Sequence, residues 1–82
     1  MEKAIQLQVR KDLDPRQQHT VLKLKGSLIS KGYTEIIHIL DKDEQYHINY
    51  FETQAGRGTE VRDYIRTFIS DENLIDAAEM LS

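Results

Sequence analysis

The chain has 82 residues, of which 39% are hydrophobic and 30% are charged, and its formal net charge is −3. This length predicts one small domain spanning 1–82. The chain contains no cysteine, which excludes disulfides, thiolate metal sites, iron–sulfur clusters and cysteine nucleophiles, and favours a reducing cytoplasm. Its apolar run at 36–40 is too short to span a bilayer, so we expect no membrane partner.

The charge is divided unevenly along the chain. Residues 1–33 carry seven Lys or Arg and three Asp or Glu, whereas residues 34–82 carry four and eleven. A net-negative chain binds nucleic acid poorly, because neutralisation of phosphates drives that binding. The division instead suits contact with another protein.

The first two elements are predicted from periodicity. Residues 4–10 alternate between apolar and polar, which is typical of a half-buried strand. Asp14 followed by proline predicts the start of a helix over 15–31. Within it, Gly26 suggests close packing against a sheet, and Gly32 predicts a left-handed C-cap.

Two further strands, 34–40 and 45–52, surround the polar tip 41–44. A turn centred on this tip pairs positions whose numbers sum to 85, which places His38 opposite His47. One face of this hairpin, the expected core, then holds Ile37, Ile39, Tyr46, Ile48 and Tyr50. The other face holds Ile36, His38, Leu40, His47, Asn49 and Phe51.

The rest of the chain predicts a loop at 53–58, an amphipathic helix over 59–69 and a last element over 74–81. Local propensity in that last segment favours helix, but a strand completes the order β-α-β-β-α-β. We therefore predict an α+β fold, a ferredoxin-like sandwich whose antiparallel sheet has two helices on one face. The open face predicts a homodimer. Its expected contact residues are Ile36, His38, Leu40, His47 and Phe51.

Two groups of residues are candidates for chemistry. His38 and His47, if opposite each other, are close enough to share a metal, although the chain supplies no further ligand, and two neutral histidines at an interface are the alternative. Gly56-Arg57-Gly58 precedes a helix but does not complete a phosphate-binding motif, so we interpret it as a partner-binding loop. We find no catalytic residue set and no cofactor motif.

The order of short motifs resembles the PurS family, the small subunit of phosphoribosylformylglycinamidine synthase. The resemblance is carried by Leu13-Asp14-Pro15 before the first helix, by 32–36 (Gly-Tyr-Thr-Glu-Ile) after it, and by 73–76 (Asn-Leu-Ile-Asp) near the end. The chain departs from the family in having Arg16-Gln17 after the first motif and an acidic hairpin tip.

The resemblance implies a non-catalytic, dimeric subunit that bridges the synthetase and glutaminase subunits in purine biosynthesis. An alternative is a small inhibitor or adaptor, phage-encoded or cellular, that docks on a larger enzyme. Residues 70–82 carry four acidic side chains and no basic one, which suits a basic cleft. A third hypothesis is a metal or nucleotide sensor that uses the histidine pair or the Gly-Arg-Gly loop.

Overall fold

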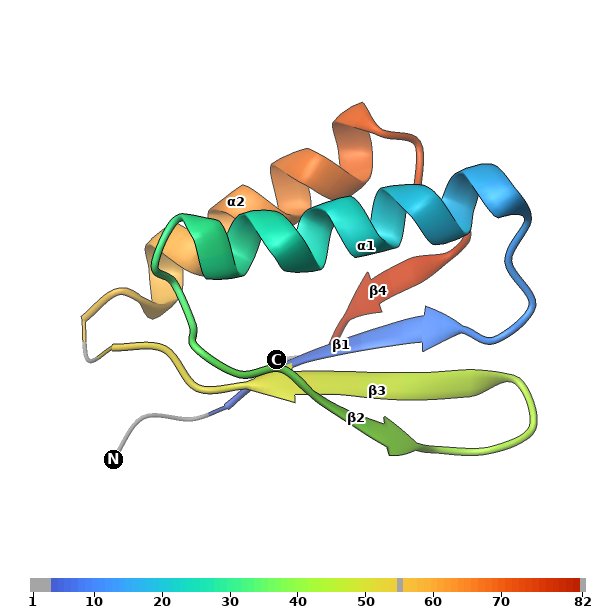
Figure 1. The fold of residues 1–82 in the computed structure, drawn as a ribbon, viewed down its shortest axis with the longest axis horizontal. Coiled ribbons are helices and arrows are strands. Elements are labelled where there is room, and N and C mark those ends of the chain that lie inside the picture. The colour runs from blue at the N-terminus through green and yellow to red at the C-terminus, as the bar shows by residue number, and fades with distance from the viewer. Residues whose placement is uncertain (1–3, 55, 82) are drawn as a thin grey trace.

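The computed structural model describes residues 4–54 and 56–81, and its elements follow the order β-α-β-β-α-β (Figure 1). The elements are β1 (Ile5–Arg10), α1 (Pro15–Ser30), β2 (His38–Asp41), β3 (Tyr46–Phe51), α2 (Gly58–Asp71) and β4 (Ala78–Met80). The segment 74–81, for which propensity and topology disagreed, contains a short strand. No helix in the described part of the chain is long and apolar enough to cross a membrane.

The strands form one antiparallel sheet in the order β2-β3-β1-β4, and both helices lie on the same side of it (Figure 1). The predicted α+β class is therefore confirmed. β1 and β3 are the two central strands, and β2 and β4 are the two edges.

Local chemistry explains both ends of α1. The Asp14 carboxylate accepts a hydrogen bond from the Gln17 backbone N–H at 2.7 Å, and the Gln17 side chain accepts one from the Asp14 N–H at 3.1 Å. At the other end Gly32 has φ 77°, and the Tyr33 N–H donates to the Leu28 carbonyl at 3.0 Å. These are the N-cap and the left-handed C-cap that the sequence predicted.

The prediction for Gly26 is wrong. This glycine is exposed, and a Cβ built on it meets no atom within 4 Å. It therefore does not serve close packing between α1 and the sheet.

The predicted register of the β2–β3 hairpin is also wrong. The structure pairs His38 with Tyr50 and Asp41 with His47, so that paired numbers sum to 88 rather than 85. The Asp43 carboxylate accepts hydrogen bonds from the backbone N–H groups of Gln45 (2.8 Å) and Tyr46 (2.9 Å), which centres the turn on residue 44. The observed and predicted sums differ by three, an odd number. Each β2 side chain therefore shares a face with β3 side chains that the prediction had placed on the opposite face.

This register decides which hairpin residues enter the core. Phe51 pairs with Ile5 and His47 pairs with Val9, on the side of the sheet that faces the helices. Phe51 is only 1% exposed, so its prediction as an open-face residue is wrong. His38 and Leu40 lie on the open side, as predicted, beside Tyr50 and Ile48.

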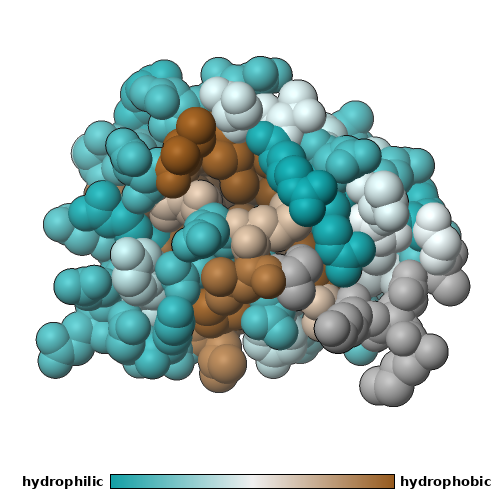
Figure 2. Space-filling view, turned by 180° about the vertical axis from the view of Figure 1, so that it is seen from behind, coloured by the Kyte–Doolittle hydropathy of each residue, from teal (hydrophilic) through white to brown (hydrophobic). Residues whose placement is uncertain are grey.

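A single core joins the sheet to both helices. Its largest fully buried side chains are Phe51, Ile5, Leu24, Leu28, Ile65, Leu74 and Val61, which come from β1, β3, both helices and the segment before β4. Figure 2 shows, from behind, apolar side chains that reach the surface within a rim of polar ones. Large apolar side chains that stay exposed are Leu22, Ile29, Ile36, Ile39, Leu40, Ile75 and Leu81.

Candidate functional site

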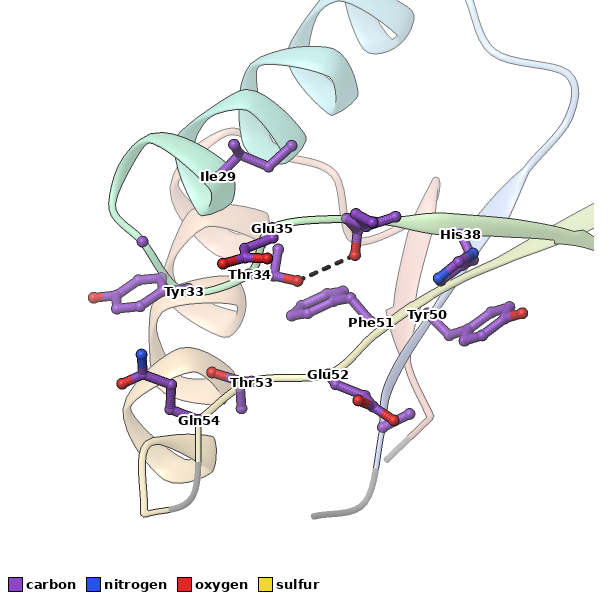
Figure 3. A pocket seen from close by; sticks show the side chains of 13 residues that line it. Ile29, Tyr33, Thr34, Glu35, His38, Tyr50, Phe51, Glu52, Thr53 and Gln54 are labelled. Carbon is purple, nitrogen blue, oxygen red and sulfur yellow. Dashed lines mark hydrogen bonds between the residues drawn. The ribbon is translucent and has the colours of Figure 1, made fainter. Parts of the chain in front are cut away.

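An open groove of about 810 Å³ lies at one end of the sheet, between the connection from α1 to β2 and the segment that follows β3 (Figure 3). It is lined by Ala4, Ile29, Gly32, Tyr33, Thr34, Glu35, Ile36, His38, Tyr50, Phe51, Glu52, Thr53 and Gln54. The predicted hairpin already brings the two connections near each other, and the end of α1 with Ile29 completes the groove in the folded chain.

A cluster of side chains at the α2 end braces the groove. The Arg57 guanidinium lies 4.9 Å from the centre of the Tyr33 ring and is paired with Glu60 at 2.8 Å. The Tyr33 ring meets Tyr64 edge-on, with centroids 5.7 Å apart, and the Lys31 ammonium lies 5.2 Å from the Tyr64 ring. This cluster ties the end of α1 to the start of α2, so the connections that form the groove are held in place.

Hydrogen bonds and charges within this cluster shift the pKa values of Glu60, Arg57 and Tyr33. Arg57 beside Glu60 holds the pKa of that carboxyl below its ordinary value, and a hydrogen bond from the Tyr33 hydroxyl acts in the same direction. The hydrogen bond to Glu60 raises the pKa of Arg57. Partial burial raises the pKa of Tyr33, and its bond to Glu60 adds to that effect. Glu60 is therefore ionised and acts as the common acceptor of Tyr33 and Arg57.

The Gly56-Arg57-Gly58 loop stands beside this groove. Gly56 has φ 87°, a conformation that favours glycine, and Arg57 is the N-cap residue of α2. The Arg57 N–H donates to the Gln54 carbonyl at 3.1 Å. The Arg57 side chain packs over the Tyr33 ring and donates a hydrogen bond to Glu60 within its own chain.

The mouth of the groove combines apolar and acidic groups. Ile29 from α1 is 48% exposed and Ile36 is 61% exposed. The carboxylates of Glu35 and Glu52 lie on opposite connections, and both residues are exposed. These groups can bind a segment that presents an apolar side chain next to a basic one.

The walls of the groove contain polar groups from Thr34, His38 and Thr53. The Thr34 hydroxyl donates to the Ile36 carbonyl at 3.1 Å, which fixes the connection that leads into β2 (Figure 3). His38 stacks on Tyr50 with ring centroids 5.0 Å apart. The Thr53 hydroxyl is buried in the wall without a hydrogen-bond partner among the described residues.

The predicted histidine pair does not form. His38 lies on the open side of the sheet against Tyr50, whereas His47 pairs with Asp41 and Val9 on the helix side. In the described ranges 4–54 and 56–81, no three His, Cys, Asp or Glu side chains are grouped in a way that would hold a metal ion. The register shift is the physical reason, since it places the two imidazoles on opposite faces.

The predicted dimer face is divided in the same way. Ile36, His38 and Leu40 remain exposed and lie on β2 or directly before it. His47 and Phe51 lie on the helix side and do not belong to this surface.

Comparisons of the chain with family models, with curated proteins and with solved structures found no match.

Proposed function

We propose that this chain is a non-catalytic subunit that holds a larger protein, and that the groove is its contact site. The observation that carries the proposal is the groove itself: two connections braced by Tyr33, Arg57 and Glu60, with Ile29 and Ile36 exposed at the mouth. Binding residues are commonly found on loops that a rigid scaffold positions. An apolar group already held in place loses less entropy on binding than one on a mobile loop.

The specific form that we propose is the PurS type, a bridge between the synthetase and glutaminase subunits of phosphoribosylformylglycinamidine synthase. The support for this form comes from the motifs that resemble the family. Asp14 caps α1, Gly32 ends it, and 73–76 form the turn between α2 and β4. The element order, the strand order β2-β3-β1-β4 and the position of both helices support a ferredoxin-like sandwich, which we include in the proposal.

The test is calorimetric titration of the purified chain against the synthetase and glutaminase subunits encoded in the same genome. We expect binding to at least one of them. Ile29→Asp should weaken that binding by at least about tenfold, because it places a charge in the apolar mouth of the groove. Leu22→Asp is the matched control, since Leu22 lies on the same helix, is 64% exposed and does not line the groove.

The outcomes separate two parts of the proposal. If neither subunit binds, the PurS assignment is wrong. If a subunit binds and Ile29→Asp has the affinity of Leu22→Asp, the groove is not the contact.

A second candidate, an inhibitor or adaptor that enters a basic cleft of an enzyme, is supported by a different surface. Asp71, Asp76 and Glu79 are exposed near the C-terminal end, where residues 70–82 contain no Lys or Arg. In this case partner binding should weaken steeply with salt and in the double variant Asp76→Asn/Glu79→Gln, while Ile29→Asp should bind normally.

A further inference from the structure

The groove carries two acidic side chains that no cation of the chain neutralises. Glu35 and Glu52 are exposed on opposite connections (Figure 3), and among the described residues that line the groove they are the only Asp, Glu, Lys or Arg. Within 4–54 and 56–81 neither carboxylate takes part in an ion pair. In the neighbouring cluster, Arg57 is paired with Glu60 and so does not balance them. The groove is therefore suited to a ligand that supplies positive charge.

One tyrosine of the groove lacks the cation that the other tyrosines have. Three of the four tyrosines have a lysine or arginine between 4.9 and 5.6 Å from the ring centre: Tyr33, Tyr46 and Tyr64. The fourth, Tyr50, is only partly buried and has no such cation among the described residues, and Glu52 follows two residues later. A guanidinium that stacks on an aromatic ring and pairs with a carboxylate is a favourable combination, which this chain already makes from Arg57, Tyr33 and Glu60.

We propose that the groove receives an arginine of the larger partner, from a segment that also presents an apolar side chain. This inference rests on the proposed function and names the chemistry of the partner. The guanidinium lies over the Tyr50 ring and donates to the Glu52 carboxylate. The apolar side chain packs on Ile29 and Ile36 at the mouth, and Glu35 adds to the attraction for a basic segment.

Charge and ring chemistry favour this segment over other occupants. An acidic segment or a nucleic acid would meet two carboxylates and, among the described lining residues, no lysine or arginine. A purely apolar segment would desolvate the carboxylates without giving them a partner. Arginine suits the site better than lysine, because its planar guanidinium can donate two N–H groups to one carboxylate while it stacks on a ring.

Short peptides test this chemistry without the intact partner. The probes are the peptide acetyl-Gly-Leu-Arg-Leu-Gly-amide and two versions in which lysine, or citrulline as an uncharged analogue, replaces the arginine. Each is titrated into the nitrogen-15-labelled chain while backbone amide shifts are followed by NMR. We expect the arginine peptide to shift amides within 34–38 and 50–54. It should bind at least about tenfold more tightly than the citrulline peptide, and more tightly than the lysine peptide.

Two matched double variants test the role of the carboxylates. Glu35→Gln/Glu52→Gln removes both charges from the groove, and we expect it to bind the arginine and citrulline peptides equally. Glu44→Gln/Glu79→Gln is the control, because it changes the net charge by the same amount at two exposed residues that do not line the groove. The control should keep the preference for arginine. Both variants change only exposed side chains, so both should fold.

The outcomes separate this inference from the proposed function. If a synthetase or glutaminase subunit binds through the groove, as judged by Ile29→Asp, but binds Glu35→Gln/Glu52→Gln as tightly as the control variant, the function stands and the arginine inference is wrong. If neither subunit binds but the preference for the arginine peptide depends on the two carboxylates, the inference stands and the PurS assignment is wrong. An arginine peptide that leaves the groove amides unshifted, or that binds no more tightly than either replacement, would overturn the inference.

Discussion

At the residue scale, two glycines of similar exposure have opposite roles. Gly26 lies in the helical interior of α1, where glycine is less favourable than alanine by about 1 kcal/mol. Gly32 has φ 77°, a left-handed conformation that costs an alanine about 1–2 kcal/mol. A Cβ at either position would meet no atom within 4 Å, so backbone conformation alone decides the effect of adding one.

We therefore expect Gly26→Ala to raise the free energy of unfolding by about 1 kcal/mol and Gly32→Ala to lower it by about 1–2 kcal/mol. Urea titrations of the two variants against the wild type measure both values. Each variant serves as the control of the other, because the added methyl group is the same. Two changes of the same sign would contradict the conformational argument.

The Tyr33–Arg57–Glu60 cluster predicts a pH dependence. The pKa of Glu60 is lowered in the folded chain from its ordinary value of 4.5, chiefly by Arg57 and then by Tyr33. A carboxyl with a lowered folded pKa stabilises the fold above the unfolded value, and the contribution is lost as pH falls through the folded value. The stabilisation by Glu60 is therefore complete above about pH 5 and declines below pH 4.5.

We expect Glu60→Gln to be less stable than the wild type at pH 7 and to lose less stability than the wild type on acidification. Unfolding titrations from pH 7 to pH 3 measure this slope. Glu44→Gln, which removes an exposed carboxylate at the hairpin turn, is the control for loss of one acidic group. Parallel curves for the wild type and Glu60→Gln would show that the cluster does not stabilise the fold.

At the element scale, the comparison of sequence with structure separates local from tertiary information. The helix over 15–31 and its two caps were predictable, because Asp14, Gln17 and Gly32 act on backbone groups within a few residues. The first three strands were also predictable from period-2 alternation, whereas the last strand followed only from completing the order β-α-β-β-α-β. The groove was not, because the approach of Tyr33 to Arg57 depends on how α1 and α2 pack over one sheet.

In the β2–β3 hairpin, the hydrogen bonds of one side chain determine the register that the sequence prediction missed. The sequence 34–52 is apolar on both faces, so its pattern did not distinguish one register from another. Asp43 does distinguish them, because its carboxylate binds the N–H groups of Gln45 and Tyr46 and moves the centre of the turn. An aspartate three residues before β3 was the available signal, and it also determines whether Phe51 faces the helices.

At the scale of the whole molecule, Phe51 joins the sheet to the rest of the core. It lies on central strand β3, pairs with Ile5 of the other central strand and is 1% exposed. Its place in the core means that Phe51→Glu would unfold the chain rather than yield a folded monomer, which corrects the interface role that the sequence suggested. A domain of this length has a net stability of about 4–12 kcal/mol.

Phe51→Ala should therefore lower the free energy of unfolding by about 3–5 kcal/mol, a large part of the total. Leu22→Ala, at a side chain 64% exposed on α1, should change it by less than about 0.5 kcal/mol. Because one core contains side chains from both layers, the transitions of Phe51→Ala seen by far-ultraviolet circular dichroism and by tyrosine fluorescence should coincide. Circular dichroism reports the helices, whereas the tyrosines lie on β3, α2 and the connection after α1. A loss below about 1 kcal/mol, or two separated transitions, would mean that the sheet and the helices do not share the core through Phe51.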